Sequence, residues 1–251
     1  MLAHRVIPQL LVDKNKLIKG QGFDAWRSVG VPQQAVRIHQ MRQVDEIMLV
    51  DITATPENRG PDLGLIEELA EVCFSPLTVG GGVKTVEDIR ELLRHGADKV
   101  CIGTAAFEDP MMVMEAVDRF GSSTIVASID VKWNRGNPLV YTRCGTRKTI
   151  VRAHRAAIGF EKMGVGEILL TNIDREGTMG GYDLKLIGDV SGDCNIPIIA
   201  AGGCSGYQDM VDAIWAGADA VAVGALFQFS DHTPRGAAEY MSEQGVEARC
   251  I

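Results

Sequence analysis

Long hydrophobic runs are absent from this sequence of 251 residues: no apolar stretch reaches the roughly 18 residues that a membrane-spanning helix needs. The first residues also lack the small-residue cleavage pattern of a signal peptide. The six cysteines form no CxxC pair, and several lie inside apolar runs, which is typical of reduced thiols. These absences predict a soluble, cytoplasmic protein.

Other absences argue against whole classes of chemistry. The five histidines have no HExxH or comparable spacing, so we expect no metal ion. There is no GxSxG elbow and no Cys/His couple that would indicate covalent catalysis, and we expect no cofactor. Acidic residues outnumber basic ones by 33 to 25, giving a formal charge of -8, and the basic residues look scattered along the chain. Nucleic acid is therefore not an expected partner.

Short apolar runs alternate with longer amphipathic stretches along the whole chain. Hydrophobic residues make up 46% of the sequence, which is enough for a large core. Alternating strands and helices indicate a parallel sheet, and the length suits eight strand-helix units. We therefore predict one domain over residues 1–251, an α/β fold of the (β/α)8 barrel type. The expected strands are Arg5–Val12, Glu46–Asp51, Leu77–Val79, Lys99–Ile102, Ile125–Asp130, Glu167–Thr171, Ile196–Ala200 and Ala220–Val223.

An internal repeat strengthens this interpretation. The segment VDEIMLVDI at residues 44–52 matches VGEILLTNI at residues 165–173, a shift of 121 positions. Residues 79–105 align with residues 200–226 at the same shift. Repeats at a fixed spacing are the signature of a duplicated structural unit. The barrel is therefore expected to consist of two half-barrels of four units each.

Glycines recur at the ends of strands in both halves. Successive backbone N–H groups at a helix start bind phosphate well, and glycine allows the close approach that a Cβ would block. Two such sites at one barrel mouth would suit a ligand with a phosphate at each end; alternatively, both halves inherited the turn and only one still binds. The residues concerned are Gly82, Gly103 and Thr104 in the first half and Gly203, Gly224 and Ala225 in the second.

Several motifs resemble those of one enzyme family. They are DITA at residues 51–54, TVGGG at 78–82, GADKV at 96–100, SID at 128–130 and GEILLTNIDREGTMGGYD at 166–183. With these motifs, which extend nearly end to end, the chain is similar to the cyclase subunit of imidazole glycerol phosphate synthase, HisF. The resemblance implies a barrel that receives ammonia from a glutaminase subunit docked at the N-terminal ends of its strands.

The resemblance also implies roles for individual residues. Asp130 matches a family carboxylate on the fifth strand and is the candidate general base. Lys19 matches a family lysine that reaches over the substrate, and Glu176 takes the place of a family aspartate. Asp51, Thr171 and Asp174 end strands two and six, where polar side chains commonly bind substrate. The expected substrate and phosphate ligands are therefore Lys19, Asp51, Gly82, Gly103, Thr104, Thr171, Asp174, Glu176, Gly177, Gly203, Gly224 and Ala225.

Two positions depart from the family pattern. Leu11 takes the place of the second catalytic aspartate, and a leucine cannot transfer a proton. Gly103 takes the place of an asparagine. These changes resemble a HisF-like branch that works with a glutaminase and an ATP-dependent N-acetyl sugar amidotransferase in surface-polysaccharide synthesis. Two alternatives stay open: the cyclase of histidine biosynthesis itself, and a non-catalytic barrel that conducts ammonia.

Four charged residues match the family's ring at the ammonia entrance: Arg5, Glu46, Lys99 and Glu167. They begin the first, second, fourth and sixth strands, and buried charges must pair with one another. We expect a closed network that forms an ammonia gate, with a purely structural plug as the alternative. Asp98, beside Lys99, matches a family residue that contacts the glutaminase.

Overall fold

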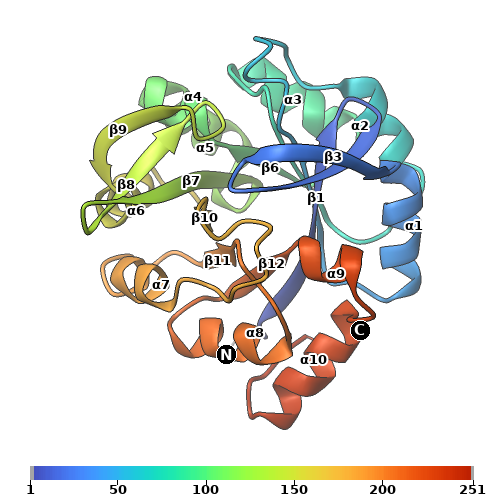
Figure 1. Ribbon diagram of the computed structural model, residues 1–251. Coiled ribbons are helices and arrows are strands. Elements are labelled where there is room, and N and C mark those ends of the chain that lie inside the picture. Colours follow the sequence, from blue (N-terminus) through green and yellow to red (C-terminus); the bar gives the residue numbers. More distant parts are fainter. Residues whose placement is uncertain (1–2, 250–251) are drawn as a thin grey trace.

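Eight parallel strands close into a barrel in the computed structural model, which describes residues 3–249 (Figure 1). The first barrel strand pairs with the last, and the pairing of the fifth with the sixth closes the ring. This confirms the predicted (β/α)8 fold. The barrel strands are β1 (Arg5–Asp13), β4 (Ile47–Asp51), β5 (Leu77–Gly80), β6 (Lys99–Ile102), β7 (Ile125–Asn134), β10 (Glu167–Asn172), β11 (Ile198–Ala201) and β12 (Ala220–Val223).

Helices surround the barrel (Figure 1). The start of α3 shows why they form where they do: Thr85 accepts a hydrogen bond from the Asp88 backbone and Asp88 returns one, a capping box that satisfies free N–H groups. No helix within residues 3–249 is long and apolar enough to cross a membrane. The helices are α1 (Pro32–Met41), α2 (Leu63–Ala70), α3 (Val86–Arg94), α4 (Thr104–Glu108), α5 (Pro110–Phe120), α6 (Ala153–Lys162), α7 (Leu184–Ser191), α8 (Tyr207–Trp215), α9 (Ala225–Phe229) and α10 (Pro234–Glu243), with a 3-10 turn at η1 (Ser122–Thr124).

Two antiparallel hairpins follow the first and fifth barrel strands, and the sequence analysis did not predict them. One consists of β2 (Lys16–Gln21) and β3 (Asp24–Gly30), the other of β8 (Asn137–Thr142) and β9 (Arg147–Arg152). They continue β1 and β7 beyond the barrel rim. In Figure 1 the β2–β3 hairpin crosses in front of the barrel, and the β8–β9 hairpin lies at its rim on the left.

The two halves of the chain repeat one another closely. Helices α1, α2, α3 and α4 begin and end 121 positions before α6, α7, α8 and α9. The first barrel strands of the two halves, β1 and β7, do not follow this spacing of 121 positions. Leu11 of β1 pairs with Val50, whereas Asp130 of β7 pairs with Thr171, and Thr171 is the repeat equivalent of Val50. Leu11 and Asp130 therefore occupy equivalent barrel positions although they are only 119 residues apart.

Alternate residues of each strand face the barrel interior, as the period of a β-strand requires. The charged residues at the strand starts form the lowest layer. Above them lies an apolar layer of buried side chains: Ile7, Met48, Cys101, Val126, Leu169, Ile199, Ala201, Ala220 and Ala222. The other strand face packs against the helices in a separate, larger cluster. A polar mouth can thus form only above the apolar layer.

Candidate functional site

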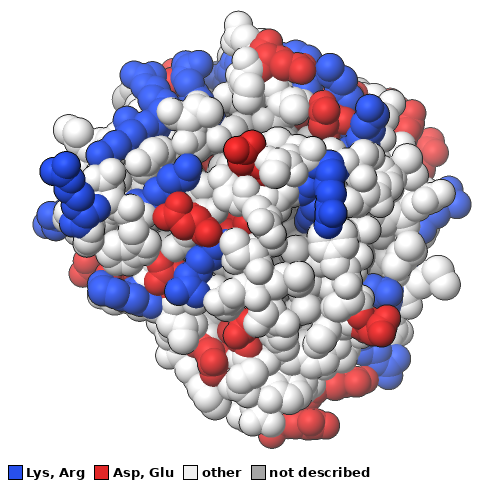
Figure 2. All heavy atoms as spheres, viewed as in Figure 1, with Lys and Arg blue, Asp and Glu red and all other residues white. Residues whose placement is uncertain are grey.

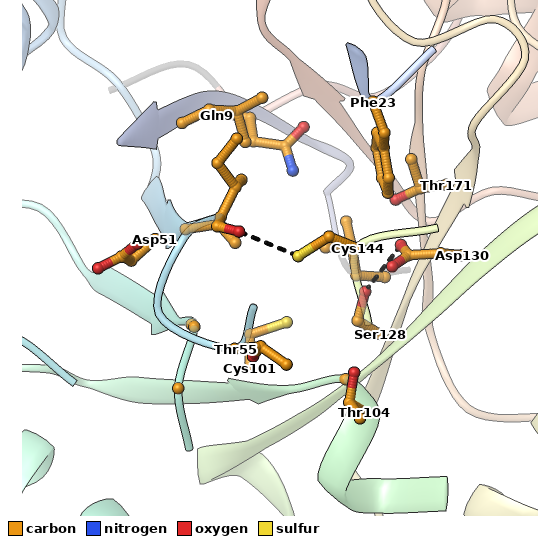
Figure 3. A pocket seen from close by; sticks show the side chains of 18 of the residues that line it. Gln9, Phe23, Asp51, Thr55, Cys101, Thr104, Ser128, Asp130, Cys144 and Thr171 are labelled. Carbon is orange, nitrogen blue, oxygen red and sulfur yellow. Dashed lines mark hydrogen bonds between the residues drawn. The ribbon is translucent and has the colours of Figure 1, made fainter. Parts of the chain in front are cut away.

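A cavity opens at the carboxyl ends of the strands, where barrels hold their ligands. Its free space is about 840 Å³, part of it open to solvent. Figure 3 shows side chains from both halves of the chain around it. The predicted site residues that line it are Asp51, Gly82, Gly103, Thr104, Asp130, Thr171 and Glu176.

Asp130 lies on the inner face of β7. Burial raises the pKa of its carboxyl to about 7, against the hydrogen bond from Ser128, while the negative charge of Glu176 raises it further. The Ser128 hydroxyl is 3.3 Å from Asp130 Oδ1. A carboxyl with a pKa near neutrality can both take and return a proton at cellular pH. The geometry therefore suits the predicted role of general base.

Leu11 also lines the cavity, at the position equivalent to Asp130 in the other half of the barrel. Its side chain is buried. Asp13, two residues later, lies at the end of β1, where its carboxylate accepts a hydrogen bond from Thr53. Of the two equivalent positions, β7 presents the acid Asp130 to the cavity and β1 presents Leu11. These two positions therefore do not form an acid-base pair across the mouth.

The glycines of the two halves line two separate pockets. Gly82, Gly103 and Thr104 lie in the main cavity. Gly203, Gly224 and Ala225 lie in a smaller pocket, together with Gly177 and Glu176. Gly82 and Gly203 have φ angles of 73° and 108°, which disfavour other residues, and Gly103 and Gly224 precede α4 and α9. Both predicted phosphate sites thus have N–H groups at a helix start.

Glu176 lines both pockets, whereas Lys19 lines neither and lies beside Gly224 of the smaller one. Lys19 Nζ donates a hydrogen bond of 3.0 Å to the Gln9 backbone carbonyl and lies beside Gly224, where a Cβ would be 2.5 Å away. Burial lowers the pKa of Lys19 to about 8, opposed by the charge of Glu176. Burial raises the pKa of Glu176, and Lys19 partly offsets that effect. A cation next to the α9 N-terminus favours binding of an anion there.

Two predicted ligands have other contacts. The Asp51 carboxylate accepts hydrogen bonds from the backbone of Thr53 and Ala54 and an ion pair of 3.1 Å from Arg59. Figure 3 shows it pointing away from Asp130. Asp174 is exposed, lines neither pocket, and accepts a hydrogen bond from the Trp133 backbone. Their roles as substrate ligands stay predictions, and the structure gives each a structural partner instead.

The hairpins add residues that the sequence analysis did not assign to the site. Phe23 and Trp26 of the first hairpin line the cavity, as does Cys144 at the tip of the second. Cys144 Sγ donates to the Ile52 carbonyl at 3.0 Å, and burial raises the pKa of its thiol to about 12. A thiol with so high a pKa is a poor nucleophile. Gly22 and Gly145, which lie in the turns of the two hairpins with positive φ angles, were the available sequence sign of these hairpins.

A closed ring of ion pairs fills the opposite end of the barrel. Arg5 contacts Glu46 at 2.6 Å and Glu167 at 2.9 Å, and Lys99 contacts the same two carboxylates at 3.1 and 2.8 Å. Burial alone would raise the pKa of Glu167, but Arg5 and Lys99 hold it below its ordinary value. Each charge thus has two partners of opposite sign, the network that burial was predicted to require.

The N-terminal face around this ring carries exposed apolar side chains. Phe74 is 87% exposed, Met41 85% and Trp215 65%, and all three lie in or beside the segments that lead into barrel strands. Asp98 is exposed too, and one of its oxygens accepts a hydrogen bond of 2.8 Å from the Leu77 backbone. Asp219 makes the equivalent bond to Ile198 at 2.9 Å, so this contact is a shared structural feature of both halves.

Basic residues are gathered beside the mouth, contrary to the expectation that they are scattered. Residues 131–152 contain six Lys or Arg and no Asp or Glu, although the chain as a whole carries -8. This segment forms the end of β7 and the β8–β9 hairpin. Figure 2 shows basic side chains concentrated on the side of the molecule where Figure 1 places β8 and β9. Such a surface attracts anions toward the mouth.

The fold and the site are those of a (β/α)8 barrel with a buried aspartate and two glycine-lined pockets at the carboxyl ends of its strands. Residues 5–233 match the family described as "Histidine biosynthesis protein", so the chain belongs to this family of barrel enzymes. Within residues 3–249, no group of three or more His, Cys, Asp or Glu side chains is arranged to hold a metal ion. The five cysteines in the described part are free, and Cys250 lies outside it.

Proposed function

We propose that this chain is the synthase subunit of a glutamine amidotransferase system. It receives ammonia from a glutaminase, conducts it through the barrel, and delivers it for transfer to a sugar or phosphosugar. The observation that carries the proposal is the ring of Arg5, Glu46, Lys99 and Glu167 below a mouth that has Asp130 but Leu11 in place of the second acid. An ATP-dependent N-acetyl sugar amidotransferase is the proposed acceptor of the nitrogen.

The barrel interior supports transfer of ammonia rather than ammonium. The layer above the ring consists of buried apolar side chains such as Ile7, Met48 and Leu169. A charged ammonium ion would lose its hydration there without a partner, whereas neutral ammonia pays a much smaller cost. Because this layer and the ring are closed as they stand, passage requires their side chains to move apart. Docking of the glutaminase would supply the binding energy for that movement.

The exposed apolar residues of the N-terminal face support a protein partner at that end. Isolated exposed apolar residues are common, but Met41 ends α1 and Phe74 lies in the loop after the neighbouring helix α2, and both loops lead into barrel strands. With a matched glutaminase, we expect the barrel to stimulate glutamine hydrolysis and Phe74→Asp to reduce that stimulation. Ile150→Asp is the control, because Ile150 is 94% exposed but lies on β9 beside the mouth.

The decisive experiment supplies the purified chain with an ammonium salt and the ribulosyl intermediate of histidine biosynthesis, which bypasses any glutaminase. We expect no imidazole formation, because one of the two acid-base groups is absent. Ring closure at the rate of family cyclases would overturn the proposal in favour of histidine biosynthesis. A barrel that stimulates its glutaminase but binds no phosphosugar would instead be a non-catalytic ammonia conductor.

A further inference from the structure

Gln9 occupies an unusual place inside the barrel. It follows Ile7 on the inner face of β1 and lies below Leu11, so it is where the apolar layer ends and the mouth begins. The residue is only 7% exposed and lines the main cavity. Its backbone carbonyl accepts the bond from Lys19, which fixes the strand at this point. Figure 3 shows the side chain directed into the cavity.

Within residues 3–249, Gln9 forms backbone contacts only: it belongs to the β1–β4 ladder, and its carbonyl accepts the bond from Lys19, whereas its carboxamide has no hydrogen-bond partner in the protein. The carboxamide atoms are not among the fully enclosed unpaired atoms, so they face the open space of the cavity. Several other polar side chains of the cavity have protein partners. Asp51 is bound by Arg59, Thr104 accepts a bond from the Arg143 backbone, and Ser128 donates to Asp130. Buried polar groups are normally paired, so an amide directed into a cavity without a protein partner is available to a ligand.

We propose that Gln9 is a specificity-determining residue that recognises the acetamido group of an N-acetylated phosphosugar. A carboxamide carries both a donor and an acceptor and no charge, so it can donate to the carbonyl of an acetamido group or accept from its N–H. These two groups point in opposite directions in a trans amide, so Gln9 would make one of the two bonds. Leu11, on the same strand face, presents apolar surface to the acetamido methyl group. This inference rests on the proposed function and specifies its substrate.

The sugar would then bind between Gln9 and Asp130 with its phosphate at one of the glycine sites. In this arrangement the first strand contributes recognition and the fifth contributes the base. A site built to hydrogen-bond a substrate group rejects an analogue without that group, because the buried polar side chain is left unpaired. The preference for the acetamido group should therefore depend on Gln9 while affinity for phosphate itself does not.

Isothermal titration with three probes tests this: N-acetylglucosamine 1-phosphate, glucose 1-phosphate and inorganic phosphate. We expect the N-acetylated sugar to bind about tenfold or more tightly than glucose 1-phosphate. Gln9→Leu should abolish this preference and leave the affinity for inorganic phosphate unchanged. Gln9→Glu keeps the size of the side chain but loses the N–H donor, so it should weaken the preference for the N-acetylated sugar. Gln34→Leu, at an exposed position of α1, is the control. Unfolding temperatures confirm that each variant is folded.

The outcomes separate this inference from the proposed function. Binding of both sugar phosphates with equal affinity, or a preference that survives Gln9→Leu, overturns the role of Gln9 and leaves the mouth a phosphosugar site. Failure of all three probes to bind overturns the phosphosugar assignment of the mouth and this inference with it. A variant pair that does not fold would be replaced by Gln9→Met, which retains the volume and removes both hydrogen-bonding groups.

Discussion

Leu11 and Asp130 lie at equivalent positions of the two half-barrels, because their pairing partners Val50 and Thr171 are related by the internal repeat. One half therefore presents an apolar side chain to the mouth where the other presents an acid. This asymmetry within a symmetric scaffold is what separates the proposed nitrogen-delivering subunit from a ring-closing enzyme. It also makes both positions open to direct tests.

Replacing Leu11 by aspartate should restore the absent acid. If the remainder of the mouth can hold the histidine-pathway intermediate, Leu11→Asp should raise ammonium-dependent ring closure by about 100-fold or more over the unmodified chain, since a general acid-base group contributes roughly 10²- to 10⁴-fold. Leu11→Asn has nearly the same shape and transfers no proton, so it should give no gain. A folded Leu11→Asp variant without activity would mean that further residues exclude the intermediate.

Asp130→Asn should change stability in a pH-dependent way. The pKa of Asp130 is raised to about 7 in the folded protein, so the fold favours the protonated carboxyl. The wild-type protein therefore loses stability as the pH rises from the ordinary pKa of an aspartate in the unfolded chain, about 4, to the folded pKa of about 7. Asparagine is neutral at every pH. The variant should therefore unfold at a temperature higher by roughly 2–6 °C at pH 8, with little difference near pH 4. A constant difference from pH 4 to pH 8, measured calorimetrically, would contradict the raised pKa.

Removal of one member of the ion-pair ring should be strongly destabilising. Glu46 is almost completely buried and contacts both Arg5 and Lys99, so Glu46→Gln leaves two buried cations with one carboxylate. Breaking a buried network in this way costs about 3–5 kcal/mol, measurable by urea unfolding. Glu91→Gln breaks the more exposed pair with Arg94 and should cost no more than about 1 kcal/mol. Equal losses in the two variants would show that the ring is not desolvated.

Gly224→Ala should weaken the second phosphate site without unfolding the protein. The added Cβ would lie 2.5 Å from Lys19 Nζ, and the flexible end of that lysine can move away, taking its charge from the α9 N-terminus. Loss of one charge-assisted contact, worth about 1.5–3 kcal/mol, should reduce affinity for pyrophosphate about tenfold or more. Gly206→Ala has nothing within 4 Å of its Cβ and is the control in the same titration. Unchanged affinity would exclude Lys19 from the site.

Charge reversal on the β8–β9 hairpin should slow association of anionic ligands. Lys148 and Arg152 are exposed and belong to the basic segment beside the mouth. The double variant Lys148→Glu, Arg152→Glu should lower the association rate for a phosphosugar at low salt, and added salt should reduce the difference because it screens the field. Stopped-flow measurements would check this, with Lys162→Glu at the far end of α6 as control. A salt-independent effect would indicate direct contact instead of steering.

The sequence by itself determined the framework. Strand and helix periodicity located all eight barrel strands, and the repeat predicted that helices such as α3 and α8 are equivalent. Strand parity placed Arg5 and Leu11 on one inner face, and the need to pair buried charge predicted the ion-pair ring. These are properties of short segments and of charge burial, which depend little on distant parts of the chain.

The tertiary structure decided which of the candidate groups are free to act. Arg59 binds Asp51, the hairpins bring Phe23, Trp26 and Cys144 over the cavity, and the basic residues of one hairpin gather beside it. The buried amide of Asn172 donates to Asp183, whereas the amide of Gln9 faces the cavity without a protein partner. Such outcomes depend on contacts between loops far apart in sequence, and neither propensity nor spacing encodes which of those contacts will form.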